Sequence, residues 1–287
     1  MAFAGLVLGR GLIGAFYAAV PVGGFALVAD HFEPQHRARA MASLGAANAV
    51  GLVVGPAAAA LLARHSLSLP FYVMAILPLL ALVVMHRRLP RQELHLAQTP
   101  GRVRLSDPRL ARPMVVAFVA MLCVTLAQIT VSFYAMDRLQ MNSADAAQTA
   151  GIALTMVGLA LICAQLVVRK LEWPPLRMIR FGALLSAVGF VGAMLVDSAW
   201  GLWLTFFVSA AGMGGVFPSF SALAANSVQA SEQGATAGSI GAAQGLGAVV
   251  GPMAGTLIYA MEPRLPYLLA ALLLALVALW PYPPKTS

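Results

Sequence analysis

The sequence predicts an all-α fold, a polytopic membrane bundle of about nine transmembrane helices. Hydrophobic residues make up 60% of the 287 residues and charged residues only 10%, whereas roughly a quarter of a soluble domain is charged. The mean hydropathy is +0.84. Apolar runs long enough to cross a bilayer recur along the whole chain. Together these features predict an integral membrane protein.

Nine apolar runs of about 18 residues or more are candidate spans. They cover 3–29, 38–63, 69–86, 113–136, 147–168, 178–196, 200–225, 235–260 and 265–282. The longest gap, 87–112, is rich in arginine and contains three prolines, which is typical of a flexible linker. We therefore expect a partial N-terminal bundle at 1–86, a basic linker at 87–112 and a C-terminal six-helix bundle at 113–287.

The net charge of +8 indicates topology rather than nucleic-acid binding. If the loops alternate sides, 14 of the 18 Lys and Arg residues fall on one side and three on the other, with Arg10 inside the first span. The positive-inside rule makes the rich side cytoplasmic. We expect a bacterial inner-membrane protein with a cytoplasmic C-terminus, in contact with membrane lipid, without nucleic acid, and monomeric.

A glycine- and proline-containing run at 239–255 dominates the second half of the chain. Gly247, Gly251 and Gly255 are four residues apart, so on a helix they share one face that another backbone can approach closely. Pro252 removes one backbone hydrogen bond and favours a bend. In a bilayer such a helix persists, because the backbone has no water to exchange hydrogen bonds with.

The same run occurs earlier in the chain. An offset of 196 residues places Gly55 and Pro56 on Gly251 and Pro252, and nine of the 17 aligned positions from Ala40 to Pro56 are identical. Shared Ala/Gly/Val composition is the alternative explanation. An internal repeat predicts two halves of like orientation, each with a broken helix, a Gly-Pro helix and a plain one. In the second half, the broken helix is the span 200–225, with Gly212, Gly214, Gly215 and Pro218.

Polar residues within spans are candidates for a transport cavity. In the span 113–136, Thr125, Gln128 and Ser132 share a helical face. Such side chains either line a wet cavity or bond neighbouring helices, and both interpretations remain open. The predicted cavity residues are Tyr17, Asn48, Thr125, Gln128, Gln165 and Gln244.

Arg10 is the one cation placed well inside a span. An intramembrane arginine marks a functional site unless its side chain snorkels to the interface. Asp30 and Arg37, in the following turn, either belong to a solvated loop or pair with helix ends in one conformation and release in another.

No pattern of residues indicates an enzyme. The sequence has no evident nucleophile–base pair, metal-ligand spacing or phosphate loop, so we expect no catalytic residue, metal or cofactor. Cys123 and Cys163 both fall within spans and are expected to be structural.

These motifs resemble those of the major facilitator superfamily, and within it the drug:proton antiporter-like members. Gly51-Leu-Val-Val-Gly55-Pro56 resembles the antiporter motif of the fifth of twelve helices. The run from Gly247 to Gly255 resembles its counterpart in the eleventh helix. Arg10 with Gly14 resembles the Arg-x-x-x-Gly motif of the fourth, which the family associates with proton transfer. The resemblance implies that the nine spans are helices four to twelve and that the first three are lacking.

The chain also departs from the antiporter pattern. Ala59 and Ala60 occupy the places of a Gly-Gly pair, Ile13 replaces the usual glutamine, and Phe16 and Tyr17 replace small residues. The resemblance implies a secondary active transporter, with proton-coupled efflux of small organic or drug-like compounds as the leading hypothesis. Arg10, Asp30 and Arg37 would form the proton or charge relay. Gly51, Gly55, Pro56, Gly247, Gly251, Pro252 and Gly255 would form the packing motifs.

Two other hypotheses remain open. The first is a nutrient or anion uptake permease of the same superfamily, with Arg10 facing an anionic substrate. The second is an inactive truncated membrane protein or a non-transporting membrane scaffold.

Overall fold

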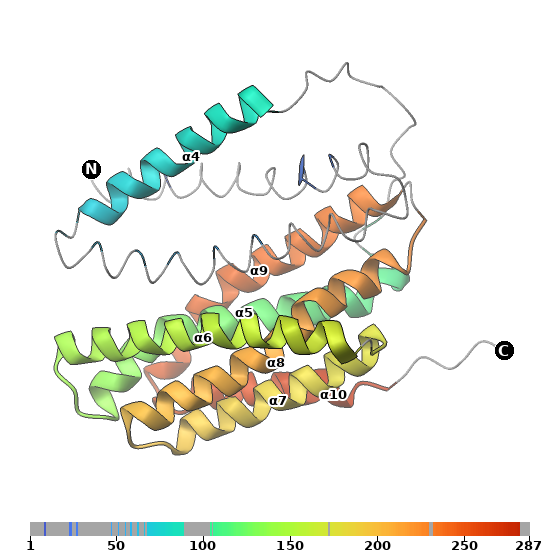
Figure 1. Ribbon diagram of the computed structural model, residues 1–287. Helices are drawn as coiled ribbons and strands as arrows, with labels where there is room; N and C mark the ends of the chain where they lie inside the picture. Colours follow the sequence, from blue (N-terminus) through green and yellow to red (C-terminus); the bar gives the residue numbers. More distant parts are fainter. Residues whose placement is uncertain are drawn as a thin grey trace.

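A computed structural model describes residues 68–88, 106–171, 173–229 and 232–281, together with Arg104 and isolated positions between 9 and 66. The first two predicted spans, 3–29 and 38–63, lie almost entirely outside the described residues. The seven that remain are helices α4 to α10 (Figure 1). Their bounds are α4 Leu69–Arg88, α5 Pro108–Asp137, α6 Ser143–Leu171, α7 Pro175–Leu195, α8 Ala199–Ala225, α9 Gln233–Tyr259 and α10 Leu265–Leu279.

Six of these helices are long and apolar enough to cross a membrane, and α10 is a shorter apolar helix. The described residues form no strand. The prediction of an all-α membrane helix bundle is therefore confirmed.

Local sequence signals fix where several helices begin. The side chain of Asp107 accepts a hydrogen bond from the Arg109 backbone N–H, and Pro108 occupies the first helical position, so α5 begins five residues before the predicted span. Pro175 likewise occupies the first helical position of α7, without a side-chain cap before it. The Ser198 side chain caps α8 by accepting from the Gly201 N–H at 3.2 Å.

Helices α5 to α10 pack side by side, and α4 is drawn apart from them (Figure 1). The closest pairs are α7 with α8, α5 with α9, and α6 with α8, while α10 packs mainly on α7. Helices α7 and α10 lie on the side of the group away from α4, and α9 lies on the side toward it. Among the described helices, α4 contacts no other.

An aromatic cluster occupies the core of the α5–α10 group. Tyr267 is fully buried, and its ring contacts those of Tyr134, Phe190 and Phe206 at centroid distances of 5.1, 6.5 and 6.2 Å. These rings come from four different helices, α10, α5, α7 and α8. The contacts with Tyr134 and Phe206 are edge-to-face, a geometry that favours one fixed arrangement of the helices.

The structure corrects the expected break in span 200–225. Helix α8 continues from Ala199 to Ala225 through its glycines and Pro218. Its glycines serve helix packing: a Cβ at Gly182 of α7 would lie 2.5 Å from the Gly212 carbonyl oxygen. The Ser186 hydroxyl also donates to the Ser209 carbonyl at 2.7 Å across this crossing. Small residues in a membrane helix let two backbones approach closely and need not interrupt the helix.

Candidate functional site

The predicted site residues divide into those that the structure describes and those that it does not. Arg10, Tyr17, Asp30, Arg37, Asn48 and Pro56 lie outside the described residues. A Cβ at Gly51 or Gly55 meets no atom within 4 Å in the part of the chain that is described. The roles of all these positions therefore stay predictions.

The three glycines of α9 form a close seam with α5. A Cβ at Gly247 would lie 2.5 Å from the Phe118 carbonyl oxygen, and one at Gly251 would lie 2.7 Å from that of Leu122. A Cβ at Gly255 would lie 3.2 Å from the Leu126 side chain. All three glycines are buried. They lie on one face of α9 against α5, and we call this contact the α5–α9 seam.

Helix α9 runs unbroken through Pro252, as predicted for a membrane helix. A second set of glycines lies on its exposed side. A Cβ at Gly238, Gly241 or Gly245 would meet no described atom within 4 Å. The two sets thus differ sharply in their surroundings.

Thr125 lies at the α5–α9 seam. Its hydroxyl donates to the Met121 carbonyl at 2.9 Å and lies 3.4 Å from the Gly247 carbonyl. A Cβ at Gly251 would collide with this hydroxyl. A polar residue predicted to line a cavity therefore also contributes to helix packing.

Gln128 is exposed, and Ser132 and Gln244 are half-buried. Because Gly247 packs near Phe118 and Gly255 near Leu126, the two helices run parallel. Gln244 then lies about ten residues of α5 away from Gln128, or ~15 Å along the axis. The structure does not bring these two amides together; Gln128 remains on one face with Thr125 and Ser132, as predicted.

Gln165 replaces a hydrogen bond that Pro218 cannot make. In an α-helix the N–H of residue 218 would donate to the carbonyl of Gly214, but proline has no N–H. The Gln165 side-chain amide of α6 donates to that same Gly214 carbonyl at 3.2 Å. Prolines persist in membrane helices where a neighbour satisfies the carbonyl they leave open. This observation favours the helix-bonding interpretation for Gln165, and its cavity role stays a prediction.

A charged cluster joins the first turn of α5 to the start of α9. The Arg109 guanidinium bonds the Asp107 carboxylate at 2.8 Å and both Glu232 carboxylate oxygens at 3.0 and 3.1 Å. Glu232 also accepts from the Gln229 backbone N–H at 3.0 Å. These bonds, first of all those with the Arg109 side chain, hold the pKa values of Asp107 and Glu232 below their ordinary range.

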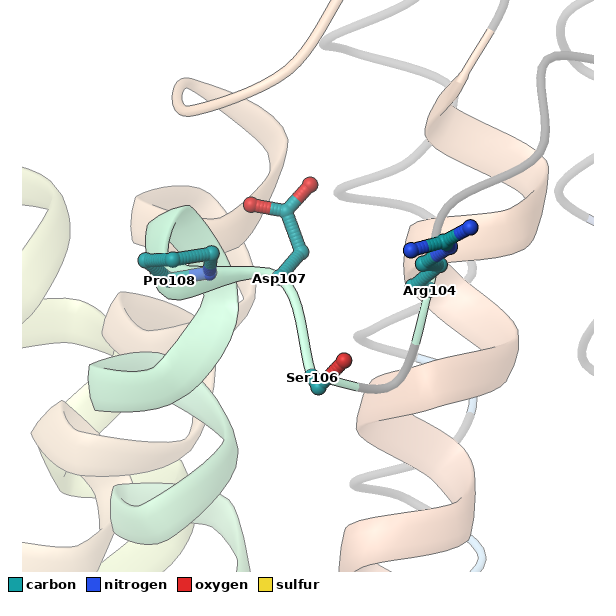
Figure 2. Close-up of a pocket in the computed structure, with 4 residues that line it drawn as sticks. All are labelled: Arg104, Ser106, Asp107 and Pro108. Atoms are coloured by element: carbon teal, nitrogen blue, oxygen red, sulfur yellow. The ribbon is translucent and has the colours of Figure 1, made fainter.

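An open hollow of about 410 Å³ adjoins this cluster and is lined by Arg104, Ser106, Asp107 and Pro108. Figure 2 shows Asp107 between Pro108, the first residue of α5, and Arg104. The hollow lies at the junction of the predicted linker with α5.

The opposite ends of α5 and α9 are also joined. The Tyr259 hydroxyl donates to the Asp137 carboxylate at 2.8 Å, and the Tyr259 and Phe133 rings contact each other at 6.0 Å. Helices α5 and α9 are thus connected at both ends and along the glycine seam between them.

In the described region, charged side chains lie near the helix ends, and the middles of the helices carry no charge. Every charged residue of α4 to α10 lies within six residues of a helix end. Among the described residues, no group of three or more His, Cys, Asp and Glu side chains could hold a metal ion.

Sequence reasoning missed the charged cluster and the Tyr259–Asp137 pair. Arg109 and Glu232 are 123 residues apart, and no local pattern links them. Only the Asp-Pro pair at 107–108, a helix-start signal, was available from the sequence.

Comparison with known proteins decides the family. The sequence profile of the Major Facilitator Superfamily matches the chain twice, over residues 1–248 and 146–287, so that the two matches span its whole length. The chain belongs to the major facilitator superfamily. Members of this superfamily are membrane transporters and are generally not enzymes. The chain is therefore a secondary transporter of a small molecule, and it lies in a lipid membrane. No curated protein matches the chain.

Proposed function

We propose that this major facilitator superfamily member exports small, amphipathic organic compounds in exchange for protons. Transport would proceed by alternating access between the partial N-terminal bundle (1–86) and the C-terminal bundle (113–287), joined by the basic linker 87–112. The side of the protein whose loops are rich in arginine would face the cytoplasm of a bacterium, as the charge asymmetry predicts. The protein would act as a monomer.

The observation that carries this proposal is the fastening of α9 to α5. The Arg109–Glu232 pair, the glycine seam and the Tyr259–Asp137 bond connect the two helices at three levels. Helices connected in this way move together, which supports rigid rocking of a bundle. The seam contains the run from Gly247 to Gly255, which resembles the counterpart of the antiporter motif in the eleventh helix.

The character of the helix middles supports the substrate class. The polar candidates Thr125, Gln128 and Gln244 are neutral, and the side chains exposed around them are apolar, among them Ile129, Phe133 and Met253. Neutral hydrogen-bonding groups on an apolar surface suit an amphipathic organic molecule. Proton coupling is assigned to Arg10 with Asp30 and Arg37, on the resemblance of their motif.

Transport in membrane vesicles of defined orientation tests the proposal. With an inside-acid gradient, everted vesicles containing the protein should accumulate a lipophilic cationic dye, and a protonophore should abolish the accumulation. Arg10→Ala should remove the pH dependence. Accumulation in right-side-out vesicles instead would establish an uptake permease, and no transport in either orientation would leave a non-transporting membrane protein.

A further inference from the structure

An apolar groove runs along the outer surface between α7 and α10. It encloses about 290 Å³ and is lined only by Leu, Val and Ala side chains: Leu184, Ala187, Val188, Val191, Leu268, Ala271, Leu272 and Ala275. Buried Ala187 and Ala271 form its floor, while Leu184, Val188 and Leu272 are 46%, 65% and 54% exposed. These small floor residues leave a channel between two helices that lie on the side of the group away from α4 (Figure 1).

Basic and aromatic side chains gather beyond one end of this groove. Arg177 lies seven residues before Leu184, so it shares the same face of α7, two turns away. Arg177 is exposed, and its guanidinium carbon lies 4.2 Å from the centroid of the Trp173 ring. Trp173 in turn contacts Phe181, the exposed residue between Arg177 and Leu184 on this face, at 5.5 Å.

Two further arginines lie at the same end. Arg180 and Arg112 donate to the Trp280 carbonyl at 2.7 and 2.9 Å, and Arg112 lies 5.5 Å from the Trp280 ring centroid. Tryptophan with arginine at the end of apolar helices is typical of the headgroup level of a membrane.

The dimensions match a phospholipid. From Arg177 to Val191, α7 advances 14 residues, or ~21 Å. One leaflet of a bilayer has ~15 Å of hydrocarbon plus a headgroup layer of several Å. A lipid with its headgroup at Arg177 would therefore lay an acyl chain along the groove within its own leaflet.

We propose that the α7–α10 groove binds a phospholipid with an anionic headgroup, whose phosphate contacts Arg177 and whose acyl chain fills the groove. Charge complementarity selects the occupant: basic side chains between helices at this level favour anionic over zwitterionic headgroups. The groove is distinct from the α5–α9 seam. This lipid site therefore goes beyond the transport function and does not depend on it.

Binding of matched lipids to the purified protein in detergent tests the site. Phosphatidylglycerol and phosphatidylcholine with the same acyl chains are titrated, and bound lipid is counted by native mass spectrometry. The wild type should prefer phosphatidylglycerol, and Arg177→Gln should reduce that preference about fivefold, as expected from about 1 kcal/mol per arginine near the headgroups. Lys170→Gln, which removes a positive charge near the C-terminal end of α6, should leave the preference unchanged.

A second pair of variants tests the groove itself. Ala275→Leu, which fills the groove, should reduce binding of both lipids, whereas Ala242→Leu on the exposed side of α9 should not. Inorganic phosphate at equal concentration should not compete. Equal binding of both lipids to the wild type, equal effects of Arg177→Gln and Lys170→Gln, or a dimer that Ala275→Leu dissociates would each overturn the proposal.

Discussion

The side-chain amide of Gln165 donates a hydrogen bond to the Gly214 carbonyl at 3.2 Å, in place of the backbone N–H that Pro218 lacks. The two residues lie on different helices, α6 and α8, and they meet through a backbone atom that belongs to neither. The proline is accommodated without a break in α8 because a neighbouring helix supplies the missing donor.

This relationship predicts a strong coupling between two substitutions. Gln165→Leu should destabilise the protein by about 1–3 kcal/mol, because the carbonyl of buried Gly214 loses a donor that the helix cannot supply. In a Pro218→Ala background, where the N–H of residue 218 is restored, the same Gln165→Leu change should cost much less. Thermal or denaturant unfolding of the four proteins in one detergent measures the coupling. Equal costs in both backgrounds would show that the bond to Gly214 contributes nothing.

The two glycine sets of α9 predict opposite responses to added volume. Gly251→Ala places a Cβ against the Leu122 carbonyl and the Thr125 hydroxyl, and should cost about 1–3 kcal/mol by overpacking. Gly245→Ala on the same helix meets open space and should be neutral or slightly stabilising, because alanine favours helix more than glycine does. The difference in unfolding temperature between the two variants checks this, with the wild type as reference. A tolerated Gly251→Ala would contradict the seam.

The Asp107–Arg109–Glu232 cluster predicts a pH dependence. The pKa values of both carboxyl groups are lowered in the folded protein, chiefly by hydrogen bonds from Arg109. Their stabilising contribution is therefore fully present above the unfolded pKa values of about 4 and is lost as the pH falls through the lower folded values. Arg109 is exposed and both carboxylates are partly exposed, so the effect should be small.

Unfolding temperatures between about pH 6 and pH 3 measure this contribution. The wild type should lose more stability on acidification than Arg109→Gln does. Lys170→Gln, which removes a positive charge from the same end but outside the cluster, should follow the wild type. Parallel curves for wild type and Arg109→Gln would count against the cluster.

Substitution of Gln128 should lower the transport rate without lowering the stability of the protein. Gln128 is exposed on α5, so Gln128→Leu should leave stability within about 0.5 kcal/mol while lowering dye transport about 2- to 10-fold, the value of one neutral hydrogen bond. Gln148→Leu, at the start of α6, also replaces an exposed helical glutamine and should leave transport unchanged. Transport rate and unfolding temperature are measured on the same preparations. Unchanged transport in Gln128→Leu would remove this residue from the substrate path.

The helices could be predicted from the sequence because apolar length is a property of each segment alone. The run 69–86 corresponds to α4 at Leu69–Arg88, and 235–260 corresponds to α9 at Gln233–Tyr259. The error at the start of α5 arose because Arg109 and Arg112 interrupt the apolar run, although Asp107 and Pro108 are good helix-start residues.

Packing faces could be predicted only where a repeat spacing revealed them. The spacing of four between Gly247, Gly251 and Gly255 indicates one face whatever the partner helix is. The glycines of α8 have irregular spacing, which suggested a break instead of contacts with α6 and α7. Gln165 could either line a cavity or bond a neighbouring helix, and the answer depends on a carbonyl 49 residues away. No local pattern specifies such a partner.

The substitution of Gln165 and Pro218 has a favoured order. If the proline changes first, the helix regains its own donor, and the glutamine becomes free to vary. If the glutamine changes first, every intermediate sequence encodes a weakened transporter until the proline is also replaced. The effect of a substitution at position 165 therefore depends on the residue at position 218. A deep mutational library of this chain should recover position-165 variants mainly in combination with a non-proline residue at 218.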